Sequence, residues 1–270
     1  MKQYQNKKIP TGLICVSRQI CDAQLKQNSD LEKDLVIDEQ AIAFVYNGIS
    51  HAVMMATPCD LHDLALGFSL SENIIDQAID LLDLELKNNS HGIELNITIS
   101  SRKFALLKQK RRTLAGNSGC GLCGIESLQQ IDKQRTPLAQ YKPIQFKVIE
   151  NALIQFKAKQ VLNLHAGGVH AAAFCDLQTG HIKLIREDVG RHNSLDKLIG
   201  AINNNGLTHS SGFILASSRA SYEMVDKTIA ANINHLVTIS APTSKAITHA
   251  KQCNLNLIGF ARTGRHVIYN

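Results

Sequence analysis

Two cysteines, Cys120 and Cys123, are three residues apart in a glycine-rich stretch that reads AGNSGCGLCGIESL from Ala115. Apolar residues follow at helical spacing from Ile125 to Ile131, which predicts that the stretch delivers Cys120 to the start of a helix. Free backbone N–H groups and the helix dipole favour a thiolate at that position. Lowering a thiol pKa from ~8.5 to ~7 takes ~2 kcal/mol, which a helix N-terminus and one or two cations supply. We therefore predict thiolate chemistry on this stretch.

A single C-x-x-C motif is compatible with three kinds of chemistry. A structural zinc site needs four ligands, and no second C-x-x-C accompanies this one, so no metal is expected. A thioredoxin-like redox pair follows the first strand of a βαβ unit, whereas a basic segment and a glycine loop precede Cys120. A sulfur-carrying nucleophile needs an exposed, pliable loop, and the glycines favour this interpretation.

Deaminase chemistry is excluded by the residues around the motif. Zinc-dependent nucleobase deaminases combine a three-layer α/β architecture with P-C-x-x-C and H-x-E motifs. Here Gly119 precedes Cys120, and no H-x-E occurs in the chain. The general acid/base of a deaminase is therefore missing.

Composition predicts the compartment and the class of partner. The 270 residues are 44% hydrophobic, which supports a sizeable core. A net charge of +6 indicates an anionic ligand, without the dense basic and aromatic clusters of nucleic-acid binding. Seven scattered cysteines, a start unlike a signal peptide and the absence of a bilayer-length apolar run predict a reduced, cytoplasmic protein away from membranes.

Three regions are predicted along the chain: a loose arm over 1–33, a small α+β domain over 34–112, and an α/β domain over 113–270. In the small domain, Asn47-Gly48 separates two alternating segments and predicts a β-hairpin. Asp60 is placed to cap the helix that follows.

A basic run, RKFALLKQKRR over 102–112, ends the small domain directly before the cysteine stretch. A solvated helix face is its more ordinary interpretation. The functional one is that these charges lower the thiol pKa or dock an acidic partner protein.

In the last region, strands alternate with helices, which predicts a mainly parallel sheet covered on both faces. The predicted strands are 164–174, 181–186, 212–216, 236–240 and 255–260, and the predicted helices are 146–161, 193–205, 221–232 and 243–252.

Polar and basic segments follow the last three predicted strands, and we call them the rim: Ser217–Arg219, Ser240–Lys245 and Ala261–Arg265. Ligands of such sheets bind at the carboxyl ends of the strands, and helix N-termini with guanidinium groups suit phosphates. The rim therefore predicts a nucleotide or pyrophosphate pocket.

Histidines and charges also gather near the predicted strands at 164–174 and 181–186. His165 and His170 flank two glycines, and a charge-rich turn contains Arg191. Functional and structural roles are both open for His170 and Arg191, and a structural role is favoured for His165.

Six motifs, taken together in this order, resemble one known family: GCGLCGIESL, GGVHAAAF, REDVGRHNSLDKLIG, SSRASYEMV, SAPTSKA and GFARTGRHVIY. The chain is similar, from about Asp38 to Tyr269, to the FdhD family of formate dehydrogenase accessory sulfurtransferases. The resemblance implies an α/β fold with a three-layer, cytidine-deaminase-like C-terminal domain and a smaller N-terminal α+β domain.

The resemblance also implies an activity. A sulfurtransferase of this family takes sulfur from a cysteine desulfurase of the IscS type as a persulfide, which falls on Cys120. It passes the sulfur to the molybdenum cofactor, Mo-bis(molybdopterin guanine dinucleotide), before insertion into formate dehydrogenase. Cys123 receives sulfur in relay or releases it through a transient disulfide. A homodimer is implied.

The resemblance further implies which residues bind the cofactor. Arg262 and Arg265 would bind its pyrophosphates, Arg219 and Lys245 would support them, and GDP is the natural mimic. Relatives commonly have Pro-Gly where this chain has Pro58-Cys59, so a role of Cys59 in a sulfur relay stays open. The resemblance implies binding by Phe260, Ala261, Arg262, Thr263, Gly264 and Arg265, and the rim segments add Arg219 and Lys245.

Two competing functions remain. One is a non-catalytic chaperone that binds the molybdenum cofactor and uses its cysteines for redox sensing or docking. The other is a thiol–disulfide oxidoreductase.

Overall fold

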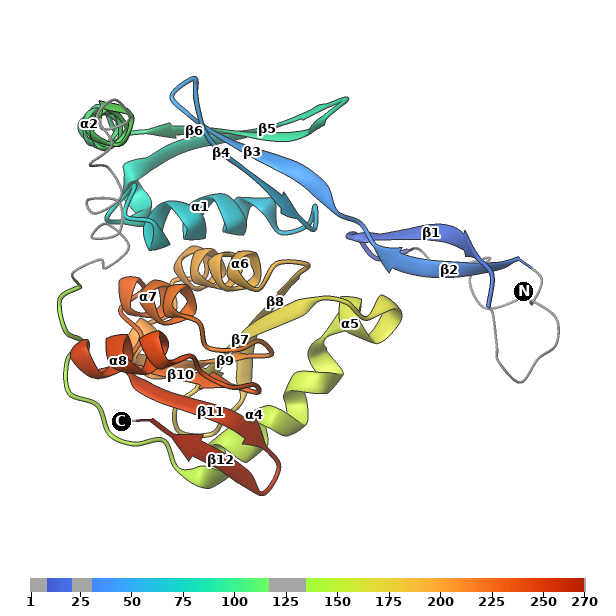
Figure 1. Ribbon diagram of the computed structural model, residues 1–270, viewed down its shortest axis with the longest axis vertical. Coiled ribbons are helices and arrows are strands. Elements are labelled where there is room, and N and C mark those ends of the chain that lie inside the picture. Colours follow the sequence, from blue (N-terminus) through green and yellow to red (C-terminus); the bar gives the residue numbers. More distant parts are fainter. Residues whose placement is uncertain (1–8, 21–30, 117–134, 270) are drawn as a thin grey trace.

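The computed structural model describes residues 9–20, 31–116 and 135–269. These residues form a two-stranded ribbon, a four-stranded sheet and a six-stranded sheet. The four-stranded sheet lies above the helices of the larger sheet, and the ribbon projects to one side (Figure 1). The predicted limits of the three regions, at residues 33 and 112, stay predictions.

The projecting ribbon pairs β1 (Leu13–Arg18) antiparallel with β2 (Glu32–Ile37). Leu35 is buried against Leu162 and holds the ribbon on the body of the protein. The loose arm predicted for residues 1–33 is therefore wrong for β1 and for the start of β2. Most side chains of β1 are exposed, so the strand lacks the alternation that would have revealed it.

The four-stranded sheet has the order β4-β3-β6-β5, with a parallel β3/β6 pair at its centre. Alternate side chains of β3 and β6 pack on helix α1 in one apolar cluster. Asn47 and Gly48 have φ values of 46° and 81°, which confirms the predicted hairpin turn. The elements are β3 (Gln40–Tyr46), β4 (Ile49–Ala56), α1 (Leu61–Ser71), the 3₁₀ turn η1 (Ala78–Asp80), β5 (Leu81–Asn89), β6 (Gly92–Ile99) and α2 (Ser101–Gly116).

Asp60 precedes α1 as predicted, but its side chain makes no capping hydrogen bond. Its carboxylate lies 3.7 Å from the Arg186 guanidinium instead. Asp60 therefore takes the predicted N-cap position, but with a left-handed backbone (φ 53°) and without the side-chain bond that a cap provides.

The six-stranded sheet has the order β12-β11-β10-β9-β7-β8. Only the β9/β10 and β10/β11 pairs are parallel, and the other three pairs are antiparallel. The mainly parallel sheet predicted from the sequence is therefore wrong, because a hairpin closes each edge. The strands are β7 (His170–Asp176), β8 (Ile182–Asp188), β9 (Gly212–Ala216), β10 (His235–Thr238), β11 (Asn256–Arg262) and β12 (Arg265–Ile268).

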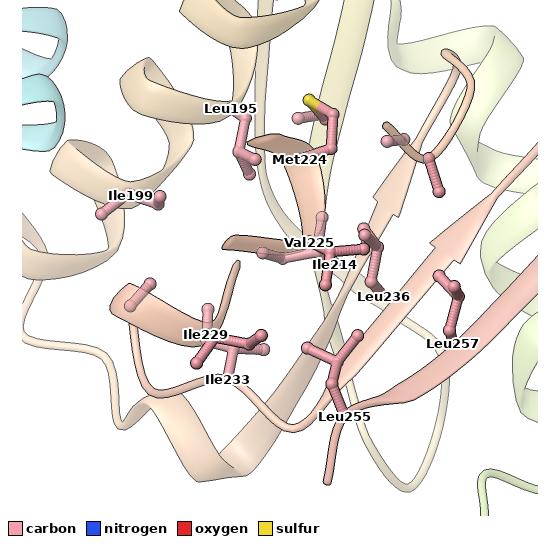
Figure 2. Packing of buried hydrophobic residues seen from close by; sticks show 14 of the residues in the cluster. Leu195, Ile199, Ile214, Met224, Val225, Ile229, Ile233, Leu236, Leu255 and Leu257 are labelled. Carbon is pink, nitrogen blue, oxygen red and sulfur yellow. The ribbon is translucent and has the colours of Figure 1, made fainter. Parts of the chain in front are cut away.

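Helices cover both faces of this sheet. On one face, α6, α7 and α8 pack on alternate strand residues such as Ile214 and Leu236 (Figure 2). Phe213 and Leu215 point to the other face and pack on α4. The α/β class is confirmed, and the likeness to cytidine deaminases stays a prediction. The helices are α4 (Phe146–Lys159), α5 (Val161–Ala166), α6 (Arg191–Asn204), the 3₁₀ turn η3 (His209–Ser211), α7 (Tyr222–Ala230) and α8 (Ser244–Gln252).

The single strand predicted over 164–174 is wrong at its start, because α5 extends to Ala166 and β7 begins at His170. Gly167 and Gly168, with φ values of 66° and 75°, end the helix. These two left-handed residues separate a helical turn from the strand.

Helices α1 and α6 pack against each other between the four-stranded and the six-stranded sheet (Figure 1). A Cβ atom on Gly67 would overlap the carbonyl oxygen of Asp196. One on Gly200 would overlap the carbonyl oxygen of Asp63. The helices therefore approach through two glycines, and a larger residue at either position would push them apart.

Candidate functional site

Cys120 and Cys123, the two cysteines of the C-x-x-C motif, lie outside the described residues. Helix α2 ends before them at Gly116, and the description resumes at Arg135. The Arg135 guanidinium donates to both carboxylate oxygens of Asp226, each at 2.7 Å, and this ion pair is buried. The segment that carries the cysteines therefore leads into an anchored arginine, and its thiolate chemistry stays a prediction.

The basic run over 102–112 forms most of α2. Lys103 is buried and pairs with Asp76. The Lys108 ammonium lies 4.7 Å from the centre of the Phe104 ring. At least one cation of the run is therefore structural, and its role towards the thiol or a partner stays a prediction.

The three rim segments adjoin one another. The Ala220 amide, directly after the first segment, donates to the Ala241 carbonyl at 3.2 Å, and the Thr243 amide returns a bond to Ala220 at 3.0 Å. The Phe260 amide donates to the Ser240 carbonyl at 3.2 Å. The predicted clustering at the carboxyl edge of β9, β10 and β11 is confirmed, whereas its role in binding stays a prediction.

The third rim segment differs from the loop that we predicted. Strand β11 extends to Arg262 and β12 starts at Arg265, so Thr263 and Gly264 form a hairpin tip. Arg262 and Arg265 pair across the two strands and are both exposed. Like charges in such a pair repel each other, and neither has an ion-pair partner among the described residues. The tip therefore carries two cations without an ion pair, and the Glu150 carboxylate contacts its backbone, accepting from the Gly264 amide at 2.8 Å.

Phe260 adjoins this tip and has a strained backbone. Its φ is 51°, a left-handed value that a bulky residue rarely adopts. It lies in an irregularity of the β11/β12 pairing and leaves 39% of its surface exposed. Such strain costs about 1–3 kcal/mol and concentrates at functional sites. The neighbouring Ala261 is buried in the core, so only its backbone can contact a ligand.

Arg219 and Lys245, the remaining predicted binding residues, are both exposed. Arg219 follows β9, and Lys245 lies in the first turn of α8. The Lys245 ammonium is 4.9 Å from the centre of the Tyr222 ring. Both cations therefore lie where the rim segments adjoin, and Lys245 is partly held by an aromatic ring.

His170 and Arg191, which the sequence left open, extend the cationic edge. His170 pairs with Asp188 across β7 and β8, and its Nδ1 is 3.4 Å from the Ser217 hydroxyl of the rim. Burial lowers the pKa of His170, and Arg191 and Arg219 lower it further. Arg191 begins α6, three residues after the last residue of β8, as the rim segments also follow strands. This position after a strand is the sequence signal that marks Arg191 as a candidate binding residue.

His165, by contrast, is exposed on α5, and its Nδ1 is 2.7 Å from the Val161 carbonyl of the same helix. This local contact agrees with the structural role that the sequence favoured. The described residues contain no group of three or more His, Cys, Asp or Glu side chains that would hold a metal ion. No described helix has the length and apolar character needed to span a membrane.

Cys59 lies at the junction of the two sheets, with its Sγ 3.8 Å from the Lys197 ammonium. Burial raises the pKa of this thiol to about 11, although Lys197 acts against the shift. A thiol that stays protonated at neutral pH is a poor nucleophile. The geometry therefore disfavours a sulfur relay through Cys59.

Comparisons with known proteins agree on one family. The FdhD/NarQ family model matches residues 37–270. The sulfur carrier protein FdhD of Cupriavidus necator is 50% identical over 239 residues, which cover 88% of this chain and 83% of that protein. The protein of the same name from Acinetobacter baylyi is 48% identical over 238 residues, covering 88% and 86%.

One solved structure has the same fold. It is the crystal structure of a candidate formate dehydrogenase accessory protein from Desulfotalea psychrophila. It matches with a TM-score of 0.71 at 19% identity and covers 96% of each chain.

Proposed function

Because the chain belongs to the FdhD/NarQ family, we propose that it is a sulfur carrier that serves formate dehydrogenase. The observation that carries the proposal is that relatives about half identical over most of the chain are named sulfur carrier proteins. The exposed, unpaired arginines of the rim support it, because they suit a phosphate-bearing acceptor.

Sulfur is accepted in one displacement. The thiolate of Cys120 attacks the terminal sulfur of a persulfide on a cysteine desulfurase of the IscS type. A new S–S bond forms on Cys120 as the donor S–S bond breaks, and the donor cysteine leaves as a thiolate. The transferred sulfur keeps its oxidation state, so the step requires neither oxidant nor reductant.

Cys120 is preferred over Cys123 because it comes first in the motif, where the helix dipole and exposure favour a thiolate most. Cys123 takes the sulfur in relay, or it attacks the Cys120 sulfur and releases hydrosulfide. The second route leaves a disulfide that a cellular thiol must reduce. The relay keeps the sulfur within one short segment, whereas the second route releases it as hydrosulfide.

The acceptor is the molybdenum cofactor, Mo-bis(molybdopterin guanine dinucleotide), bound as substrate on the rim before it enters formate dehydrogenase. Arg262 and Arg265 bind pyrophosphate, with Lys245 and Arg219 in support. The guanine stacks on Phe260, whose strained backbone keeps the ring exposed beside the arginines.

The sulfur step is tested by mass spectrometry after incubation with a cysteine desulfurase and cysteine. We expect the wild type to gain the mass of one sulfur atom on Cys120, and a Cys120→Ala variant to gain none. Cys123→Ser is the matched control and keeps the first persulfide. An undiminished persulfide in Cys120→Ala contradicts the assignment.

A Cys120→Ser variant separates the carrier from a cofactor-binding chaperone. The carrier proposal expects the variant to bind the molybdenum cofactor but to leave formate dehydrogenase inactive. Full activation by this variant would favour the chaperone. Insulin reduction by the wild type would favour the thiol–disulfide oxidoreductase.

The acceptor site is tested with GDP as a probe. Exchanging both Arg262 and Arg265 for Gln removes two charge-assisted contacts, so we expect GDP affinity to fall at least about tenfold by calorimetry. Arg18→Gln is the matched control, because that arginine is exposed and lies on β1 of the separate two-stranded ribbon. Unchanged affinity in the double variant contradicts the rim site.

We also propose that the protein works as a homodimer in the cytoplasm. Sedimentation equilibrium of the purified chain tests the oligomeric state. A monomer at all concentrations would contradict it.

A further inference from the structure

A second group of cations lies on the same edge of the large sheet, beyond the rim arginines. Strand β7 runs between β8 and β9 and is antiparallel to both, so its first residue lies beside their ends. His170 begins β7, Arg191 follows β8, and Arg219 follows β9. The sheet topology therefore gathers three residues that are far apart in sequence.

The carboxylate beside this group is already engaged. Asp188 is fully buried and lies 2.6 Å from the Lys197 ammonium. It also accepts hydrogen bonds from the Thr57 and Gly190 amides at 3.1 and 2.8 Å. Its charge is therefore matched by a buried cation. The other nearby carboxylate, Glu223, is largely exposed and lies 3.4 Å from His192. Burial raises the pKa of Glu223, whereas the Ser221 hydroxyl, His192 and Arg191 lower it, so Arg191 has one carboxylate in its surroundings.

Arg191 differs from the arginines that hold the fold together. Arg135 and Arg186 each donate to a carboxylate within 2.8 Å. The Arg191 Nε is shielded from solvent, yet it has no hydrogen-bond partner among the described residues. Arg219 is exposed and has no ion-pair partner among them either. A shielded donor without a partner costs about 1–3 kcal/mol and is a mark of a site that a ligand completes.

The spacing fits a phosphate of the same ligand. From Phe260 on β11 to His170 on β7 there are three strand intervals, or about 14 Å at 4.7–4.9 Å each. An extended nucleoside diphosphate has a comparable length. A base at Phe260 therefore places the terminal phosphate near Arg219 and Arg191.

We propose that Arg191 and Arg219, beside His170, form an anion subsite for a phosphate group of the guanine nucleotide whose base lies at Phe260. This proposal rests on the proposed function for the identity of the nucleotide. The positive end of the α6 dipole, at Arg191, adds to the field of the two guanidinium groups. The subsite takes the terminal phosphate, and the arginines of the hairpin tip contact the phosphate nearer the base.

The test compares GDP with inorganic pyrophosphate by calorimetry on the full chain. We expect Arg191→Gln and Arg219→Gln each to lower the affinity for both probes at least about tenfold, and Arg18→Gln to leave it unchanged. Arg191→Lys should recover part of the affinity because it keeps the charge. Arg219 is exposed, so its exchange keeps the test valid if Arg191→Gln does not fold.

The outcomes separate this subsite from the proposed function. GDP binding that depends on Arg262 and Arg265 but not on Arg191 and Arg219 would overturn the subsite alone. Pyrophosphate binding that depends on Arg191 and Arg219, without any GDP binding by the wild type, would keep the subsite and overturn the nucleotide assignment. Binding of neither probe would overturn both.

Discussion

Cations are numerous in two regions: the junction, where α1 and α6 pack between the two larger sheets, and the rim of the large sheet. Those of the junction are buried and paired, whereas the arginines of the rim are exposed. At the junction, Lys197 pairs with Asp188 at 2.6 Å and Lys227 pairs with Asp196 at 2.9 Å, and all four side chains are almost fully buried. On the rim, Arg262 is exposed and has no ion-pair partner among the described residues.

The difference follows from the cost of burying charge. A buried cation without a partner is strongly destabilising, so each junction cation is held by carboxylates and by carbonyl or hydroxyl oxygens. Lys197 also donates to the Thr57 carbonyl at 2.9 Å, and Lys227 donates to the Ser71 hydroxyl at 2.9 Å. An exposed arginine bears no such cost and stays available to an anion. Pairing therefore distinguishes the charges that fold this protein from those that bind.

The largest expected effect is the loss of a junction carboxylate. Asp188→Asn leaves the Lys197 ammonium buried without a counter-charge, so we expect the free energy of unfolding to fall by about 3–5 kcal/mol. Urea denaturation measures it. Glu85→Gln is the matched control, because the exposed Glu85–Lys87 pair contributes at most about 1 kcal/mol. Equal losses in the two variants would contradict the contrast between buried and exposed pairs.

A smaller loss is expected where α1 and α6 cross. Gly67→Ala places a Cβ atom against the Asp196 carbonyl, and overpacking of this kind costs about 1–3 kcal/mol. Asp196 also pairs with Lys227, so a shift of its backbone would reach this buried ion pair. Urea denaturation measures this loss too. Lys157→Ala, on the exposed side of α4, should change stability little. A Gly67→Ala variant as stable as the wild type would show that α1 and α6 can accommodate the added Cβ atom without loss.

Local patterns predict much of this fold. The Asn47-Gly48 turn, the helix after Asp60 and the strand at Gly212–Ala216 depend on neighbouring residues, and all three are present. The α5 turn and β12 are too short to show a period. The predicted strand over 164–174 therefore included the end of α5, and β12 was not predicted. The predicted strand directions were also wrong. The order of helices and strands along the chain does not reveal that a hairpin forms each edge of the sheet.

The candidate site also has parts that local sequence predicts and parts that it does not. The rim could be predicted because its segments share a position after buried strands, and Arg191 shares that position too. The junction pairs could not, because the Thr57 amide and the Asp188 carboxylate that it contacts are 131 residues apart. Nothing in the sequence near Lys197 tells a buried, paired ammonium from a free one. Burial, which depends on the whole fold, decides that.

The smallest effect is a titration, and it tests the rim side of the comparison directly. Arg191 and Arg219 lower the pKa of His170 in addition to burial, whereas Asp188 raises it. Removing one positive charge makes protonation of the imidazole easier, so the pKa of His170 should rise in Arg219→Gln. Histidine NMR signals followed against pH measure the change. The control is His235, whose pKa burial lowers to about 4. It is the first residue of β10 and lies at the end of the strands opposite the rim, so its pKa should not change. An identical pKa of His170 in both proteins would show that Arg219 does not act on it. His170 would then not belong to the group of cations at the rim.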